Sequence, residues 1–335
     1  MYDVVTIGTA TRDVFLLSRS FKVLQDPEHL KKIGFSTGEA QCFALGTKID
    51  LDDVILSVGG GAANTAVTFA RQGLKTAAVA IVGDDDRGRD ILRTLKSEKI
   101  YYLGTQEKNT ATTYSTILLS PAGERTVLVY RNPKENVTIK KIPFAKIKSR
   151  WIYIVPGAMT DETLTRLMTE MKKRKIKIAI NPSKYFLNFP KDRAAALLNL
   201  ADLVTLNREE AATLAAVDYE SERAIFSQLD KIIGGIVVMT DGARGVLVSD
   251  GQKIYRAGIY QEKKIADRTG AGDAFGSGFT AALIRGQSIE AAIRLGSANA
   301  TAVVEKVGAH LGALTRQDFE SDARWRDLSV AVISL

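Results

Sequence analysis

The sequence predicts an α/β fold, in which helices flank a mostly parallel β-sheet and a smaller β-rich unit is attached. Two observations predict it. From about Trp151 onward, short apolar runs alternate with segments of helical period, which is typical of strand–helix–strand units in a parallel sheet. Residues 11–58 and 103–132 hold β-type segments with little helical periodicity, so we assign them to a separate small sheet.

The first half of the chain opens with a buried strand, an apolar run at 4–8 that ends in glycine. A helical pattern at 62–71 stops before Gly73, and the pattern at 87–99 places Ile91, Leu92 and Leu95 on one face of a helix. The other elements expected here are strands at 14–17, 49–57 and 76–82, a turn near 27–32, and a hairpin of 113–119 and 126–130 around the loop 121–124.

The second half alternates regularly between strand and helix. Asn181 and Pro182 end one of its strands, because proline cannot continue a strand in the middle of a sheet. We expect strands at 152–155, 176–180, 203–206, 236–239, 245–249 and 253–255, helices at 161–173, 207–215, 273–285 and 289–306, and a strand or packed tail at 329–335.

These elements divide the chain into two units. Residues 1–10, 59–102 and 133–335 form the α/β core, and residues 11–58 and 103–132 form a small β-sheet lid that projects from it. The chain has no low-complexity linker.

The composition excludes several classes of protein. Of 335 residues, 45% are hydrophobic and 25% are charged, as in an ordinary globular protein. A single cysteine, Cys42, and two distant histidines, His29 and His310, exclude a disulfide framework, a zinc cluster and a Ser/His/Asp hydrolase. No signal peptide and no apolar run of about 20 residues is present, so we expect a cytoplasmic protein with no membrane partner.

The net charge of +8 raises the alternative of nucleic-acid binding. The Lys and Arg residues are, however, scattered in short clusters, and no basic motif with interleaved aromatic residues is present. A basic surface without a nucleic-acid partner is therefore the expectation.

The most informative motif is Asp-Arg-Thr-Gly-Ala-Gly-Asp at 267–273, just before a long helix of small and apolar residues. A turn with Gly270 and Gly272 aims free backbone N–H groups at one electropositive point at the helix start, which suits a phosphoryl group in transfer. Asp273 beside that point can accept a proton from an attacking hydroxyl. The alternative is that Asp273 only caps the helix. Because Asp267 and Thr269 accompany it, phosphoryl transfer is favoured.

A second glycine turn, Gly-Gly-Gly-Ala-Ala-Asn at 59–64, also precedes a helix. Gly60 and Gly61 permit close approach of a ligand to the backbone, and Asn64 offers a donor and an acceptor that suit neighbouring hydroxyls. The alternatives are a structural tight turn and a dinucleotide-binding fingerprint, which lacks its third glycine here. A Walker A motif is absent from the whole sequence, so any use of ATP does without a P-loop.

The two glycine motifs, their order and their separation resemble the signature regions of the ribokinase-like (PfkB) family of carbohydrate kinases, over nearly the whole chain. The resemblance implies a three-layer α/β/α core with a mostly parallel central sheet, a β-sheet lid over the sugar, and ATP with Mg²⁺. Because relatives often pair their lids, it also implies a homodimer.

The resemblance assigns site residues to positions in this sequence. Asp273 matches the catalytic base, and the backbone of Gly270, Ala271 and Gly272 matches the anion hole. The sugar contacts implied are Asp13, Gly60, Gly61 and Asn64. Asn207 and Glu210 form an N-x-x-E motif, whose members order magnesium and phosphates through water; by themselves they form a helix capping box. The remaining implied contacts are Thr240 and Gly242 at the nucleotide, Asn299 beside the adenine, and Asp267 at a monovalent cation such as K⁺.

The sequence also departs from the family pattern. Gly61 stands where ribokinases often carry Lys, and Val155-Pro156 stand where a sugar-binding Glu is common, so ribose is not the expected substrate. Arg268 replaces a smaller residue and faces either phosphates or solvent. The alternatives left open are a nucleoside kinase of the same fold and a sensor that binds sugar or nucleotide without catalysis. We expect an ATP-dependent kinase of a small-molecule hydroxyl.

Overall fold

The computed structural model describes residues 1–35, 38–120, 125–182 and 184–334. In this part of the chain the main sheet has ten strands in the order β18-β17-β16-β15-β14-β13-β12-β1-β6-β8. The seven neighbouring strands β15, β14, β13, β12, β1, β6 and β8 run parallel. Strands β16, β17 and β18 are antiparallel additions at one end. The mostly parallel sheet is thus confirmed. Its strands are β1 (Tyr2–Gly8), β6 (Thr76–Val79), β8 (Tyr101–Tyr102), β12 (Ser149–Val155), β13 (Lys177–Ile180), β14 (Leu203–Asn207), β15 (Ile236–Thr240), β16 (Val246–Ser249), β17 (Lys253–Ala257) and β18 (Val330–Ser334).

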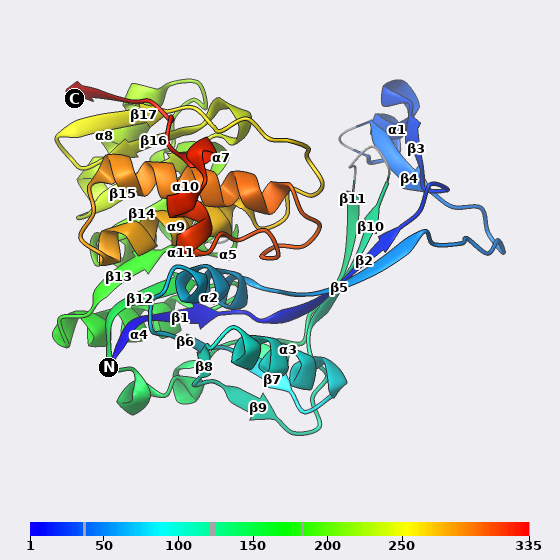
Figure 1. Cartoon of the computed structure of the whole chain (residues 1–335), viewed down its shortest axis with the longest axis horizontal. Coiled ribbons are helices and arrows are strands. Elements are labelled where there is room, and N and C mark those ends of the chain that lie inside the picture. Colours follow the sequence, from blue (N-terminus) through cyan, green and yellow to red (C-terminus); the bar gives the residue numbers. More distant parts are fainter. Residues whose placement is uncertain (36–37, 121–124, 183, 335) are drawn as a thin grey trace.

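Helices cover both faces of this sheet, as Figure 1 shows. Alternate strand residues face opposite layers: Val4 and Tyr153 pack with α2, α9 and α10, whereas Val5 and Ile152 pack with α4, α6 and α8. The main helices are α2 (Gly61–Arg71), α3 (Asp86–Ser97), α4 (Asp161–Lys173), α5 (Lys184–Leu187), α6 (Lys191–Asn199), α7 (Arg208–Ala215), α8 (Glu222–Ile232), α9 (Ala271–Ile284), α10 (Ile289–Val304) and α11 (Arg316–Ser321). No helix in the described residues is both long and apolar enough to cross a membrane.

A second sheet projects from this core, at the right of Figure 1. Its strand order is β11-β10-β2-β5, and we call these four strands the lid sheet. They are β2 (Thr11–Leu17), β5 (Asp53–Gly59), β10 (Tyr114–Leu119) and β11 (Arg125–Tyr130). Strands β10 and β11 are antiparallel, which confirms the predicted hairpin, while its loop at 121–124 lies outside the described residues. Between β2 and β5 lie β3 (Lys22–Gln25), α1 (Pro27–Lys32) and β4 (Glu39–Cys42).

The prediction of a single strand at 76–82 is wrong, because the chain forms two strands there, β6 and β7 (Ile81–Gly83). Ala80 lies at the break, and its carbonyl oxygen accepts hydrogen bonds from the Tyr102 hydroxyl (2.8 Å) and the Thr105 amide (3.2 Å). The chain then pairs in a separate two-stranded sheet with β9 (Thr105–Glu107). Segment 103–132 therefore contains β9, which does not pair with the lid sheet.

Candidate active site

The turn before α9 is held in a conformation that only glycine tolerates. Gly270 has φ of +81°, and a Cβ there would lie 2.4 Å from the carbonyl oxygen of Ala309. The Asp267 carboxylate braces the turn: one oxygen accepts from the Thr269 amide (2.9 Å) and hydroxyl (2.7 Å), and the other from the Gly308 amide (3.3 Å). Because Asp267 is buried and its oxygens are engaged in this way, its visible role is to fix the turn.

Amide groups at the start of α9 are available to a ligand. In the described part of the chain, the amides of Gly270 and Gly272 donate to no protein group, and that of Ala271 makes only a 3.4 Å bond to the Arg268 carbonyl oxygen. Gly272 is exposed. The geometry fits an anion hole, because free amides and the positive end of the helix dipole meet at one point.

Asp273 connects the two glycine motifs. One of its carboxylate oxygens accepts a hydrogen bond from the Asn64 side-chain amide at 2.9 Å, although the two residues are 209 positions apart. The other lies 3.5 Å from the side-chain nitrogen of Asn181. Burial raises the pKa of the Asp273 carboxyl to about 6, and the bond from Asn64 opposes this rise. A carboxylate with such a pKa is charged at neutral pH and is a competent base.

The first glycine turn packs closely against its surroundings. Gly60 has φ of +88°, and a Cβ on Gly61 would lie 2.2 Å from a methyl carbon of Val155. Gly61 therefore faces Val155, and its lack of a side chain serves packing. Asn64 is buried, and its side-chain oxygen Oδ1 has no hydrogen-bond partner in the described residues. This oxygen is a free acceptor next to Asp273.

Asp13 lies on the face of the lid sheet next to this turn. In the sheet it stands between Ser57 and Ser115, and a Cβ on Gly59 would lie 1.9 Å from its carboxylate. Burial raises the pKa of the Asp13 carboxyl, against hydrogen bonds from Thr11 and Ser115. The fold thus brings Asp13, Gly60, Asn64 and Asp273 into one region.

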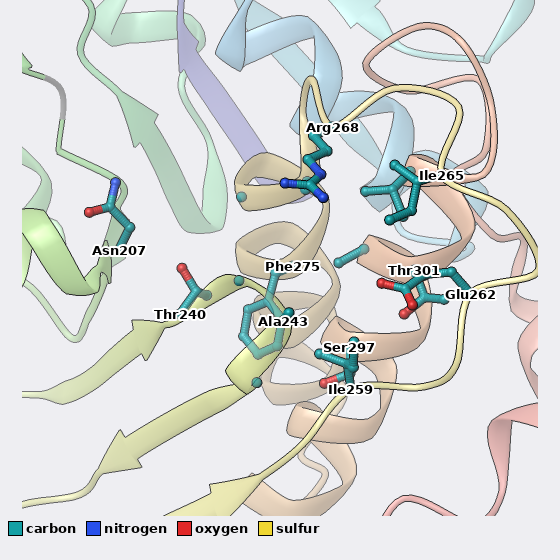
Figure 2. A pocket seen from close by; sticks show the side chains of 16 residues that line it. Asn207, Thr240, Ala243, Ile259, Glu262, Ile265, Arg268, Phe275, Ser297 and Thr301 are labelled. Atoms are coloured by element: carbon teal, nitrogen blue, oxygen red, sulfur yellow. The ribbon is translucent and has the colours of Figure 1, made fainter. Parts of the chain in front are cut away.

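Two adjoining cavities meet at the start of α9. The larger, of about 420 Å³, has an apolar wall that includes Ile259, Ile265 and Phe275 (Figure 2). The smaller, of about 260 Å³, is lined by Asp273, Asn181 and Thr205. Both cavities include Asn207, Thr240 and Gly272 in their walls. An apolar slot that opens onto a polar cavity suits a flat base with its phosphates directed toward Asp273.

Asn207 and Glu210 form the capping box at the start of α7. The Asn207 side chain accepts from the Glu210 amide (2.8 Å), and the Glu210 carboxylate accepts from the Asn207 amide (2.9 Å). Both line the smaller cavity, and burial raises the pKa of Glu210. These oxygen ligands are of the type Mg²⁺ prefers, and the described residues contain no group of three or more His, Cys, Asp or Glu that could cage a metal directly.

The remaining predicted residues divide into two groups. Thr240 and Gly242 line the larger cavity, as does Arg268, which is also exposed to solvent (Figure 2). Asn299 requires a correction: its side chain is fully buried and bonds to the Ala274 carbonyl oxygen and the Leu314 amide, so it lines neither cavity. Its neighbours Ala300 and Thr301 line the slot instead.

Sequence reasoning missed several residues that line the two cavities. Asn181 was recognised only as the end of a strand, although the carboxyl end of a parallel strand is where ligands bind in such folds. Thr205 lies within the next strand of the sheet, β14, where the sequence pattern does not set it apart. Others that it missed include Ile259, Glu262, Ile265, Ser297, Ala300 and Thr301, which lie in segments without a glycine motif.

Comparisons with known proteins agree with this arrangement. Residues 27–316 match the model of the pfkB family of carbohydrate kinases. The chain is 28% identical over 281 residues to a ribokinase of Haemophilus influenzae, covering 78% of this chain and 86% of that protein. It is 27% identical to a cytidine kinase of Thermococcus kodakarensis, covering 75% of this chain and 88% of that protein.

Solved structures show the same fold. An adenosine kinase from Sinorhizobium meliloti has a TM-score of 0.78 at 21% identity, covering 96% of this chain and 99% of that one. A ribokinase of Arabidopsis thaliana, solved with ribose and ATP, has a TM-score of 0.77 at 19% identity, covering 97% of this chain and 99% of that one. The chain therefore belongs to the pfkB family of carbohydrate kinases and is an ATP-dependent phosphotransferase whose acceptor is an alcohol group.

Proposed function

We propose that this kinase phosphorylates a hydroxyl of a sugar or sugar derivative, with Asp273 as the base and the backbone at 270–272 as the anion hole. The observation that carries the proposal is the meeting of Asp273, its partner Asn64 and unpaired amides at the junction of two cavities. The Asp13 carboxylate and the side-chain oxygen Oδ1 of Asn64 bind acceptor hydroxyls on the lid side.

In this mechanism Asp273 accepts the proton of the acceptor hydroxyl as its oxygen attacks the γ-phosphorus. The bond from that phosphorus to the bridging oxygen of ADP breaks, and ADP leaves with the electron pair. The amides at the start of α9 stabilise the charge on the phosphoryl oxygens, because this transfer depends mainly on positioning and electrostatics. Asn207 and Glu210 would hold the water shell of a bound Mg²⁺, which would neutralise phosphate charge.

The lid sheet excludes water from the acceptor, which limits wasteful hydrolysis of ATP. In this proposal the lid comprises the described residues of 11–58 and 103–132, apart from β9, and the core comprises the described residues of 1–10, 59–102 and 133–335. A cytoplasmic location, where ATP is abundant and Cys42 stays reduced, suits the reaction.

The second candidate function is that of a nucleoside kinase, with a nucleoside as the acceptor. The matches to a cytidine kinase and an adenosine kinase favour keeping it. Ribose is disfavoured as the substrate. Ribokinases often carry Lys at the position of Gly61 and a sugar-binding Glu at the position of Val155-Pro156, whereas here Gly61 packs against Val155. A sensor without catalysis is disfavoured, since it needs neither a base nor open amides.

The test is ADP release with ATP and Mg²⁺ across a panel of ketoses, aldoses, sugar acids, sugar phosphates and nucleosides. We expect turnover with one class of sugar. Turnover with nucleosides alone replaces the sugar by the nucleoside proposal, and tight binding without turnover in every class supports the sensor. Replacing K⁺ by Na⁺ in the same assay tests the monovalent cation predicted beside Asp267.

A further inference from the structure

Two buried hydroxyl groups beneath Asp273 take no part in the mechanism above. They belong to Tyr153 on β12 and Thr205 on β14, the strands on either side of β13. Tyr153 is level with Ala179 of β13 in the sheet register. The small side chain of Ala179 leaves room for the tyrosine ring to reach across β13 toward Thr205.

Neither hydroxyl has a hydrogen-bond partner outside this pair in the described part of the chain, and the Thr205 hydroxyl interacts with that of Tyr153 and opposes the rise of its pKa. Tyr153 is 0% exposed and Thr205 is 3% exposed. Burying hydroxyls that leave part of their hydrogen-bonding capacity unused costs free energy, and a phenylalanine and a valine would fill the same space without that cost. Two such groups side by side next to the proposed base point to a use in the reaction.

Helix α9 approaches these hydroxyls closely. Gly276 lies three residues after Asp273, on the same face of the helix. A Cβ on Gly276 would lie 2.2 Å from the Tyr153 hydroxyl and 3.3 Å from the Thr205 hydroxyl. The glycine therefore allows the start of α9, with Asp273, to lie directly over the pair. The charge of Asp273 raises the pKa of Tyr153, second to burial, which agrees with this proximity.

The groups that face Asp273 come from four directions. Asn64 on α2 gives its one short hydrogen bond, and Asn181 after β13 gives a long one of 3.5 Å. Glu210 on α7 lines the same cavity, and Arg268 lines the adjoining one. No salt bridge reaches Asp273 from the described residues, so its charge depends on neutral donors.

We infer that Tyr153 and Thr205 are positioning residues for Asp273: their hydroxyls donate hydrogen bonds to its carboxylate when the acceptor binds and keep it aimed at the acceptor hydroxyl. Hydrogen bonds of catalytic groups are often long before substrate binds and shorten in the complex. The inference rests on the proposed role of Asp273 as the base.

The test measures kcat against pH for Tyr153→Phe and Thr205→Val, because kcat reports the pKa of Asp273 in the complex with bound acceptor. Losing a donor to the charged carboxylate raises the pKa of Asp273, so the acidic limb of the profile moves up by about one pH unit. We expect kcat at pH 7 to fall about tenfold with the KM for ATP unchanged. Thr205→Ser, which keeps the hydroxyl, restores the wild-type profile.

Tyr255→Phe is the matched control, because the Tyr255 hydroxyl is bonded to Asp250 in the turn between β16 and β17 and lines neither cavity. It leaves the profile unchanged. The inference is overturned if both active-site variants keep the wild-type profile, or if they lose activity together with thermal stability while the acidic limb stays in place. Asp273→Asn, measured in parallel, separates the proposed role of Asp273 as base from the positioning role of Tyr153 and Thr205. Full turnover in that variant would show that Asp273 is not the base.

Discussion

At the residue scale, the burial of Asp273 gives the carboxyl a pKa that suits a base, but it also lowers the stability of the folded chain at neutral pH. Its carboxyl has a pKa of about 6 in the folded chain, above the ordinary 3.8, because burial disfavours the charged form. The folded state therefore binds the proton more tightly than the unfolded state does. The free energy of unfolding falls as the pH rises from about 4 to about 6, and this loss persists above pH 6.

We therefore predict that Asp273→Asn is more stable than the wild type at pH 8, by about 1–3 kcal/mol, since the variant buries no charge. The difference becomes small near pH 4 and disappears below about pH 3, where the carboxyl is protonated in both states. Urea unfolding at the two pH values measures it. A variant that is less stable than the wild type at pH 8 would show that the charge is well compensated.

Sequence reasoning identified the residues of the two glycine motifs because backbone geometry demands glycine there. It failed for Asn299, whose amide satisfies buried backbone groups of α9 and of the chain at Leu314. It also missed Asn181 and Thr205, since an isolated Asn after a strand or Thr within one has many structural uses. Such roles depend on what the sheet places beside them, which only the fold reveals.

At the element scale, α7 combines a helix cap with a predicted metal function. Glutamine at position 210 can still accept from the Asn207 amide, whereas alanine cannot. We predict that Glu210→Gln keeps the stability of the wild type but needs several-fold more Mg²⁺ for half-maximal turnover. Glu210→Ala loses about 1 kcal/mol of stability as well. Equal Mg²⁺ dependence in all three proteins would leave Glu210 as a cap alone.

Helix α2 and strand β12 meet at Gly61 and Val155, with no space for a methyl group between them. We predict that Gly61→Ala lowers the free energy of unfolding by about 1–3 kcal/mol and reduces turnover, because it displaces Asn64. Val155→Ala in the same chain should recover part of both. Thermal melts and ADP release on the two single variants and the double variant measure the coupling, and purely additive effects would contradict direct contact.

The elements themselves were predictable where the period of the pattern was clear, as for α4 and the parallel strands. The break at Ala80 was not, because residues 76–82 are uniformly apolar and the hydrogen bonds that divide them come from residues 102 and 105. Helices α6 and α8 went unassigned although both bury apolar residues at helical spacing, such as Ile225, Phe226 and Leu229.

At the scale of the whole molecule, the lid sheet has two different faces. Asp13, Ser57 and Ser115 form a polar row on one face. On the opposite face, Leu56 and Leu128 lie in one row and are 56% and 55% exposed. Exposed apolar side chains on a small sheet favour a partner surface. We therefore propose that two copies pair through this face.

Sedimentation tests the pairing. We predict that the wild type is a dimer and that the double variant Leu56→Glu with Leu128→Glu is a monomer, because four charges would be buried in each dimer. Leu45→Glu, at a fully exposed position between β4 and β5, is the control and should remain dimeric. A wild-type monomer at micromolar concentration would contradict the proposal.

The central claim is that Asp273 takes the proton while the helix start holds the phosphoryl group. Its most direct test is the turnover of Asp273→Asn with the best acceptor, alongside the dissociation constant for ATP by calorimetry. We predict that kcat falls about 10³-fold, within the range for loss of a general base, while ATP binds as tightly as in the wild type. Turnover within tenfold of the wild type would contradict it.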